Sequence, residues 1–386
     1  MNFIKTILYN SWAGRNILRP VFVLPCIVIS FLGMESCGSG NGGDNGDDFN
    51  RALLLENWCD NIIIPSYEDY NASTEALKVA NEEYSLDPTN EEAFNACIDA
   101  FEVTYFKWQS VAPFDFGPAI QKTLLESTNK FPTDIDDIEA AILNPDFTPG
   151  LPSTLDNIGL PAIDYLLNSE NAFANLSNDA ERVAHLERLV DHLHEKSSDV
   201  LAAWTSGYAM TFKSATGTEV GSSLEQVVNA FNRVYEANVR KQKLGLPSGI
   251  MTITGTELPG HVEALYSNDL SVDLLHSAIV AFENFYLGNY TADNGTTLEG
   301  LGLDDYLNSF GNEVYGSELN TDIVNQLSLM KEAVLTLESP LSEYVLSNPA
   351  ETAAVFTQLQ AIVVLWKVDM MSSLGIMISY TDNDGD

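Results

Sequence analysis

The sequence predicts an all-α protein made of two antiparallel helical bundles. Apolar residues recur at three- and four-residue spacings over long segments, which is the period of an amphipathic helix. Few runs alternate polar and apolar residues over a length that could form a sheet. Short turns with Gly and Pro separate the long segments, and 386 residues are too many for one small core.

The clearest predicted helix spans residues 179–212. Two others are expected before it, at 50–83 with a kink at Pro65 and at 90–110 after an Asp-Pro-Thr turn. The apolar residues of the helix at 179–212 fall on one face: Val183, Leu186, Leu189, Val190, Leu193, Val200, Leu201 and Trp204. In the second half, helices are predicted at 222–243, 268–287, 317–337 and 351–379.

The expected boundary between the bundles is the Ser-Ala-Thr-Gly-Thr turn at 214–218. It divides the folded part into an N-terminal bundle, residues 50–214, and a C-terminal bundle, residues 215–386. Each half carries one Gly/Pro turn, at Gly117 and at Gly245. The two turns hint at related bundles, although the halves show no convincing sequence identity.

The first 36 residues are typical of an export signal. Lys5, Arg15 and Arg19 precede an apolar run at 20–34, which is shorter than the ~20 residues of a membrane span. Cys37 follows, and the Gly- and Asp-rich segment 37–49 has the composition of a flexible tether. We expect a lipoprotein of the cell envelope whose first residue after cleavage is an acylated Cys37. An ordinary cleaved signal and an uncleaved anchor are the alternatives.

The charge balance is strongly acidic. The chain has 18 basic and 55 acidic residues; without the three basic and one acidic residues of 1–36, 15 basic and 54 acidic residues remain, a net charge of −39. Such a field repels nucleic acid and anionic lipid headgroups and attracts cations. It excludes a nucleic-acid role and leaves the lipid anchor as the membrane contact. Cys59 and Cys97 are either a disulfide or two buried thiols.

Several segments, in order, resemble the imelysin family. They are an apolar run broken by Pro65, an aromatic turn at 114–118, the segment from Gly159 to Leu167, and the turn at 243–249. The closing segment 367–386 resembles the last helix and Asp-rich end of members from Bacteroidetes-like bacteria. The resemblance covers roughly residues 50–386 and implies two helical bundles with a ligand cleft between them.

The family's Gly-x-His-x-x-Glu motif is altered here. A His and a Glu three residues apart lie on one side of a helix and can share a metal or a proton. The His position is Pro161 and the Glu position is Asp164. Proline offers no metal-binding nitrogen but fits the first turn of a helix. We therefore expect a retained structural joint and no metal site from this motif, with Asp164 as the weak remaining candidate for a metal ligand.

Four residues are candidates for binding a ligand in the cleft. Asp164 and Tyr165 follow the altered motif, Lys243 begins the family-like turn, and Trp108 precedes the aromatic turn. Each has a structural alternative: Asp164 could cap a helix or pair with a cation, Tyr165 and Trp108 could be core residues, and Lys243 could complement a helix end. Lys243 belongs to a basic cluster with Arg233, Arg240 and Lys241 that could bind an anion or pair locally.

A literal His-x-x-Glu occurs at His192 and Glu195. On the helical wheel both residues point away from the apolar face, so we expect them to face solvent, as we do His185 on the same stripe. His261 stands two residues before Glu263, a poor spacing for a shared helical site. His276 is expected to be a hydrogen-bonded core residue.

The sequence favours a non-enzymatic binding lipoprotein of the outer membrane, facing the periplasm or the exterior. The resemblance links it to iron or haem uptake, with a small ligand or cation in the cleft and outer-membrane iron or haem transporters as partners. The first alternative is a metal-dependent peptidase of the same family, which would need at least three protein ligands for zinc. The second is a structural or partner-binding lipoprotein.

Overall fold

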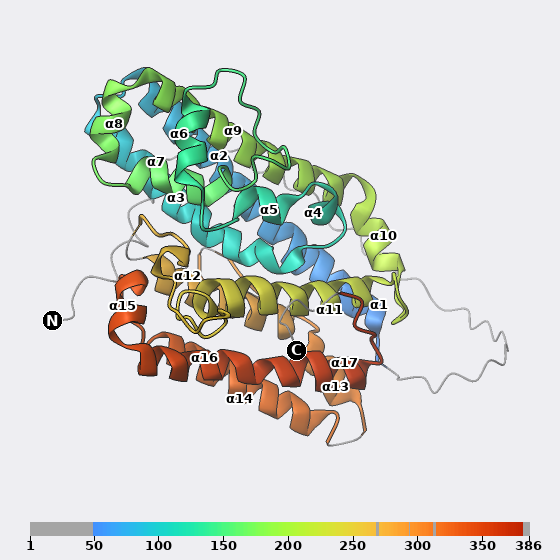
Figure 1. Ribbon diagram of the computed structural model, residues 1–386. Helices are drawn as coiled ribbons and strands as arrows, with labels where there is room; N and C mark the ends of the chain where they lie inside the picture. The colour runs from blue at the N-terminus through green and yellow to red at the C-terminus, as the bar shows by residue number, and fades with distance from the viewer. Residues whose placement is uncertain (1–48, 268–269, 293, 312–313, 381–386) are drawn as a thin grey trace. The chain divides into compact units, whose positions relative to one another are not determined.

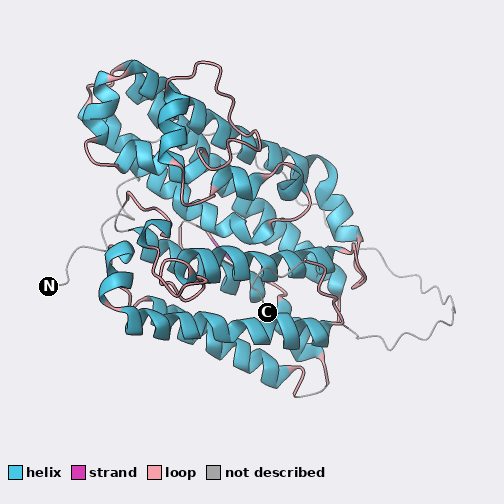
Figure 2. Cartoon of the chain, viewed as in Figure 1, coloured by secondary structure: helices cyan, strands magenta, loops and turns pink. Residues whose placement is uncertain are grey.

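Helices form nearly all of the regular structure in the computed structural model, which confirms the predicted all-α class (Figure 2). The structure describes residues 49–267, 270–292, 294–311 and 314–380. The predicted signal segment, Cys37 and the tether up to residue 48 lie outside these ranges. The described strands are β1 (Asn289–Thr291) and β2 (Thr297–Glu299), an antiparallel hairpin in which Tyr290 is opposite Leu298.

The N-terminal half contains three long helices and several short ones. Its elements are α1 (Arg51–Asn57), η1 (Trp58–Ile63), α2 (Ile64–Leu86), α3 (Glu91–Val111), η2 (Ala112–Phe114), α4 (Pro118–Gln121), α5 (Leu124–Thr128), α6 (Ile135–Ile142), α7 (Gly159–Asn168), α8 (Ala172–Asn178), α9 (Ala180–Ala203), η3 (Trp204–Tyr208) and α10 (Ala209–Ser214).

The C-terminal half is built around α11, α12, α14 and α16. Its elements are α11 (Ser223–Val234), η4 (Tyr235–Gly245), η5 (Pro259–His261), α12 (Leu270–Tyr286), α13 (Leu303–Ser309), α14 (Ser317–Val334), α15 (Leu341–Ser347), α16 (Pro349–Val363), η6 (Val364–Met370) and α17 (Met371–Leu374). In Figure 1, α14 (orange) and α16 (red) run beside each other.

Polar side chains set the starts of the long helices. Asn90 accepts hydrogen bonds from the backbone N–H groups of the first turn of α3, and Asp179 does the same for α9. Ser222 caps α11, and Glu225 reaches back to the N–H of Gly221 at 2.9 Å. Each side chain satisfies donors that the helix itself leaves unpaired.

Several of the predicted helices contain irregularities. The distortion expected at Pro65 is a π-helical turn just before it, in which the N–H of Ile64 bonds to the carbonyl of Cys59. The prediction of a single helix at 179–212 is wrong. Gly207 has an extended φ of 164° and interrupts the helical backbone between α9 and α10. Glycine lowers helix stability enough for such a break.

The buried apolar side chains of both halves form one continuous core. Phe285 of α12 stacks on Trp58 with ring centroids 4.5 Å apart, and it meets Phe114 edge-on at 5.3 Å. The described residues accordingly form one compact unit. Cys59 and Cys97 are both buried free thiols in this core.

The stretch from α16 to α17 is long and apolar enough to cross a membrane by composition. Its buried side packs against α14, as in the core helix of a bundle. One side of this stretch is therefore covered by α14.

Candidate functional site

Helix α7 begins with a glycine that no other residue can replace without strain. Gly159 has φ +74°, and a Cβ on it would lie 2.4 Å from the carbonyl oxygen of Thr128. The close approach fixes the start of α7 against the end of α5. Pro161 occupies the first turn of α7 and is buried, as its missing N–H allows.

Asp164 lies on α7 and is 1% exposed. Its carboxylate accepts hydrogen bonds from the backbone N–H of Tyr266 at 2.9 Å, from the hydroxyl of Ser267, and from the amide of Asn168 at 3.2 Å. Burial raises the pKa of Asp164 to about 6, and these hydrogen bonds partly oppose the rise. Both carboxylate oxygens are therefore engaged by protein groups.

Tyr165, the next residue of α7, makes a separate set of contacts. Its hydroxyl donates to Glu139 Oε1 at 2.6 Å, and the same carboxylate pairs with Arg182 at 2.5 Å. The Tyr165 ring meets the ring of Tyr266 edge-on, with centroids 5.2 Å apart. Tyr165 thus packs on the same loop that binds Asp164.

Lys243 lies at the end of η4, where it forms a buried ion pair with Glu263. The Lys243 ammonium also donates to Gln109 Oε1 at 3.0 Å. Burial lowers the pKa of Lys243, and the charge of Glu263 partly opposes this. The carboxylate of Glu263 accepts two further bonds, from Gln109 Nε2 at 3.2 Å and from Asn129 Nδ2 at 2.7 Å. We call the three donors Lys243, Gln109 and Asn129 the Glu263 pocket.

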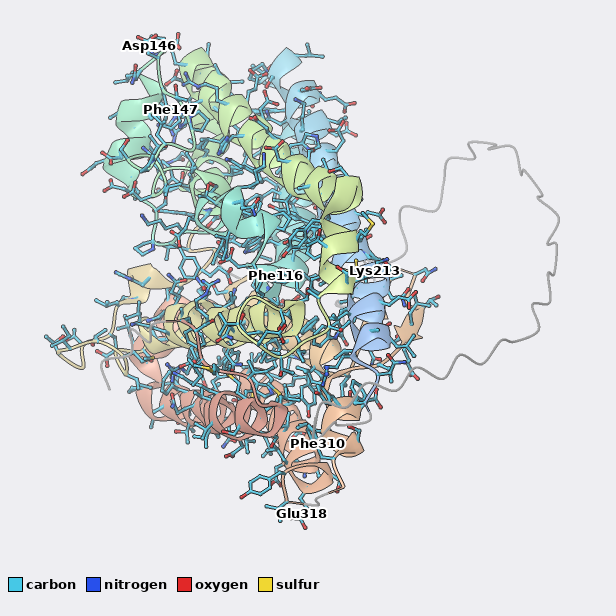
Figure 3. All side chains as sticks on the ribbon, turned by 90° about the vertical axis from the view of Figure 1, so that its right-hand side faces the viewer. Phe116, Asp146, Phe147, Lys213, Phe310 and Glu318 are labelled. Atoms are coloured by element: carbon cyan, nitrogen blue, oxygen red, sulfur yellow. The ribbon has the colours of Figure 1, made fainter. Side chains whose placement is uncertain are left out.

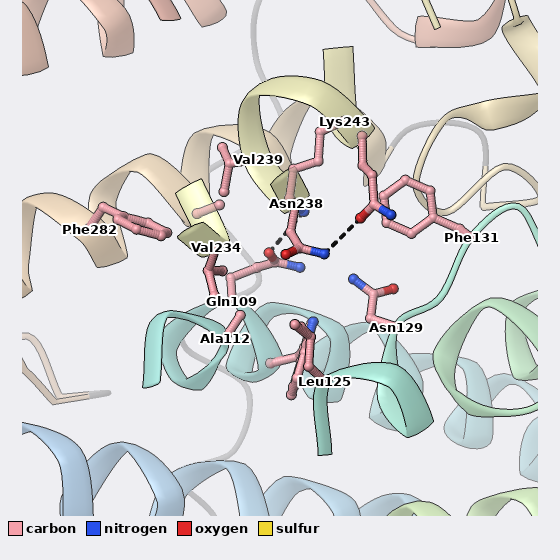
Figure 4. A pocket seen from close by; sticks show the side chains of 13 residues that line it. Gln109, Ala112, Leu125, Asn129, Phe131, Val234, Asn238, Val239, Lys243 and Phe282 are labelled. Carbon is pink, nitrogen blue, oxygen red and sulfur yellow. Dashed lines mark hydrogen bonds between the residues drawn. The ribbon is translucent and has the colours of Figure 1, made fainter. Parts of the chain in front are cut away.

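A small cavity adjoins the Glu263 pocket (Figure 4). Its volume, about 20 Å³ for the centre of a water molecule, suits one or two waters and no larger molecule. Trp108 and Phe282 form apolar walls, and Asn238 and Gln242 line it on the η4 side. Trp108 is a buried wall residue whose ring also packs on Tyr70 at 5.6 Å.

One loop connects these groups. Residues 261–267, the linking segment, precede α12 and carry Glu263, Tyr266 and Ser267. At one end the segment inserts Glu263 between Lys243 and the N-terminal half, and at the other it binds Asp164. The structure therefore brings Asp164, Tyr165 and Lys243 into contact with one segment, and Trp108 lines the cavity beside Lys243.

The basic cluster near Lys243 pairs inside the protein. Arg233 donates to the carboxylate of Asp115 at 2.7 Å, and Arg240 donates to the side-chain oxygen of Gln360. These contacts match the local-pairing alternative for the two arginines.

The expectation that His185 and His192 face solvent is wrong. Both are buried, because the loop from 143 to 158 covers this face of α9. Gly150 lies against the His192 ring, and Phe147 packs on His185 with centroids 5.0 Å apart (Figure 3). Burial, helped by neighbouring arginine charges, lowers the pKa of His185 to about 4. Glu195 is exposed as expected.

The residues at the altered motif do not fit a catalytic metal. Pro161 has no ligand atom, and both oxygens of Asp164 are used by hydrogen bonds. Among the described residues, no three His, Cys, Asp or Glu side chains are grouped so as to hold a metal ion.

Sequence reasoning missed Glu263, Gln109 and Asn129. Glu263 was considered only as a partner for His261, two residues away. Its one sequence signal is a lone carboxylate in the apolar run Val262-Glu263-Ala264-Leu265, where a charge requires a buried partner.

Fold and site together define an all-helical protein whose two halves are joined by buried polar contacts at the altered motif. The imelysin family model matches residues 63–367, and the chain belongs to this family. The chain is 21% identical over 370 residues to iron-regulated protein A of Synechococcus elongatus, with 92% of each chain covered.

Two crystal structures share the fold. One is described as an iron-regulated protein A precursor from Parabacteroides distasonis, with a TM-score of 0.71, 16% identity, and 86% of this chain and 96% of that chain covered. The other is an imelysin-like protein from Psychrobacter arcticum, with a TM-score of 0.68, 17% identity, and coverages of 86% and 97%.

Proposed function

We propose that this chain is a cell-envelope lipoprotein, anchored through Cys37, that binds an iron- or haem-containing ligand between its two halves and does not cleave peptides. The proposal that the protein is not a peptidase rests on one observation, the hydrogen bonds that occupy both carboxylate oxygens of Asp164. Its two oxygens accept bonds from Tyr266 and Ser267 of the linking segment. A carboxylate used in this way joins two parts of the fold.

The iron link rests on relatives. Two of the similar proteins are described as iron-regulated. The ligand would enter between the halves, next to Lys243 and Trp108, with Asp164 and Tyr165 at the far end of the linking segment. Outer-membrane iron or haem transporters are the proposed partners.

Ligand binding by purified protein tests this proposal. Residues 37–386, prepared without chelators, would be titrated with haemin by absorbance and with ferric citrate by calorimetry, and incubated with a peptide mixture. We expect saturable binding of one iron species and intact peptides. Lys243→Met should weaken binding, whereas the matched change Lys78→Met, at a lysine paired with Asp191 on the surface, should not.

Two results would contradict the proposal. Peptide cleavage that requires a bound metal would favour the peptidase. Absence of binding to either iron species would favour a structural or partner-binding role, which cross-linking to outer-membrane transporters would then examine.

A further inference from the structure

The carboxylate of Glu263 is held as a bound carboxylate ligand would be. Three donors from three separate elements converge on it: Gln109 from α3, Asn129 from the loop after α5, and Lys243 from η4. The exposed fractions of these side chains are only 1%, 8% and 4%. Charged and amide donors in such a dry site bind an anionic oxygen more strongly than they do in water.

The donors are held in position by groups other than Glu263. The hydroxyl of Tyr105 donates to Asn129 Oδ1 at 2.9 Å, which orients the Asn129 amide toward the pocket. Gln109 Nε2 also bonds to the carbonyl of Tyr105 at 3.3 Å, and Gln109 Oε1 accepts from Lys243. The Glu263 pocket is thus formed by the two halves and would persist around another carboxylate.

The segment that supplies Glu263 is held under backbone strain. Ala264, the next residue, has φ +53°, a left-handed conformation that a residue with a Cβ rarely adopts. It is 2% exposed, so burial holds it there. Strain of this kind is commonly found in ligand clamps and switch segments, and it lowers the work needed to displace the linking segment.

The adjoining cavity extends from the pocket toward partly exposed residues. The adjoining cavity touches Lys243 on one side and the half-buried Asn238 and Gln242 on the other. The Lys243 ammonium donates hydrogen bonds to Glu263 and to Gln109. The side of Lys243 that faces the cavity is where an incoming oxygen would first meet it (Figure 4).

We propose that the Glu263 pocket is a binding site for a carboxylate group of a small ligand, and that Glu263 is a built-in occupant that the ligand displaces. This rests on the proposed ligand-binding function and specifies its chemistry. Ferric polycarboxylate complexes and the propionates of haem both offer such a group. The cavity is too small for either, so binding requires the linking segment to move, which also breaks the Tyr266–Asp164 bond.

The test removes the built-in occupant. Glu263→Ala and the wild type are titrated with acetate and with citrate, by calorimetry and by the shift in Tm. We expect Glu263→Ala to bind both at least tenfold more tightly than the wild type, because the internal competitor is gone. Glu263→Ala combined with Lys243→Met should lose this binding.

The matched control is Glu236→Ala. Glu236 is a second buried carboxylate, 5% exposed, held by Lys367 at 3.0 Å and by the hydroxyl of Tyr380 at 2.6 Å. If acetate stabilises Glu236→Ala as strongly as Glu263→Ala, the effect is a general response to a lysine whose carboxylate has been removed, and the proposal is overturned. If Glu263→Ala does not fold, Glu263→Ser, whose short side chain also leaves the pocket empty, is used, with a tenfold gain for citrate again expected and an unchanged affinity counting against the site.

The two proposals can fail separately. Tight acetate and citrate binding with no affinity for ferric citrate or haemin would keep the carboxylate site and remove the iron link. Iron or haem binding that Glu263→Ala and Lys243→Met leave unchanged would keep the function and overturn this site. Between the two iron ligands, the one whose affinity rises in Glu263→Ala is the one that uses the pocket.

Discussion

The carboxylate of Asp164 accepts a hydrogen bond from the backbone N–H of Tyr266, which is 102 residues further along the chain, at 2.9 Å. The acceptor stands on α7, where the family motif has its second polar residue. The donor belongs to the segment that also inserts Glu263 beside Lys243. The altered motif is therefore one of two attachments of the same loop.

Stability should depend on pH through Asp164. The pKa of its carboxyl is raised from 3.8 to about 6, so the folded protein takes up a proton that the unfolded chain does not take up until lower pH. Stability is therefore gained as pH falls through 6 toward 4, by up to about 3 kcal/mol for two pKa units. Urea unfolding at pH 7.5 and pH 4.5 should show this gain in the wild type relative to Asp164→Asn.

Asp304→Asn is a useful comparison for that experiment, since burial also raises the pKa of Asp304 to about 6. Asp304→Asn should remove the contribution of Asp304 to the pH dependence of stability and leave that of Asp164. A constant stability difference between the wild type and Asp164→Asn at both pH values would contradict the assignment.

The start of α7 should tolerate no side chain. In Gly159→Ala, the new Cβ would meet the Thr128 carbonyl at 2.4 Å in a left-handed conformation. We expect a loss of about 3 kcal/mol or more in the free energy of unfolding. Gly255→Ala separates the two causes, because Gly255 has φ +67° but no atom within 4 Å of its Cβ position; its loss should be about 1 kcal/mol. Equal losses in the two variants would show that the clash with Thr128 is relieved.

The buried ion pair should be far more costly to break than to neutralise. Lys243→Met leaves the carboxylate of Glu263, 1% exposed, without its cation, and we expect a loss of about 3–5 kcal/mol. Adding Glu263→Gln removes the unpaired charge and should restore about half of that loss. Denaturant unfolding of the two single variants and the double variant measures this coupling. A double variant less stable than Lys243→Met would refute it.

The sequence predicts those features of the fold that depend on neighbouring residues, and it misses those that depend on contacts between distant segments. The apolar spacing that predicts the helix at 179–212 is a property of neighbouring residues, and α9 occupies most of that range. The break at Gly207 was not foreseen, because a single Gly within an amphipathic pattern is usually tolerated. His192 was expected in solvent because a helical wheel shows which face lacks apolar residues, and it cannot show that the loop containing Gly150 covers that face.

The candidate site shows the same division. Asp164 and Lys243 were chosen from a family-like motif and turn, and both are in the buried joint. Glu263 could not be paired with Lys243 in advance, since nothing local couples two residues across the turn at 245–258. Gln109 and Asn129 are still further away in sequence, and only the folded chain brings both amides to the carboxylate of Glu263.

Anchoring should depend on one cysteine. If the signal segment is processed as proposed, Cys37→Ala should shift the protein from the membrane fraction to the soluble fraction, because the acyl chains supply the membrane affinity. Cys26→Ala, a change in the apolar part of the same segment, is the matched control and should stay with the membranes. Fractionation with radiolabelled palmitate measures both, and an unlabelled wild-type protein would speak against acylation at Cys37.

The linking segment also determines when the amino-terminal half can finish folding during synthesis of the protein. The ribosome releases α3, α5 and α7 before residue 263 is synthesised. During that time Gln109 and Asn129 lack the carboxylate of Glu263, and Asp164 lacks the N–H of Tyr266. The amino-terminal helices therefore cannot complete their interior while the remainder is still being synthesised. A nascent chain halted near residue 250 should remain sensitive to protease, and one extended past α12 should become resistant.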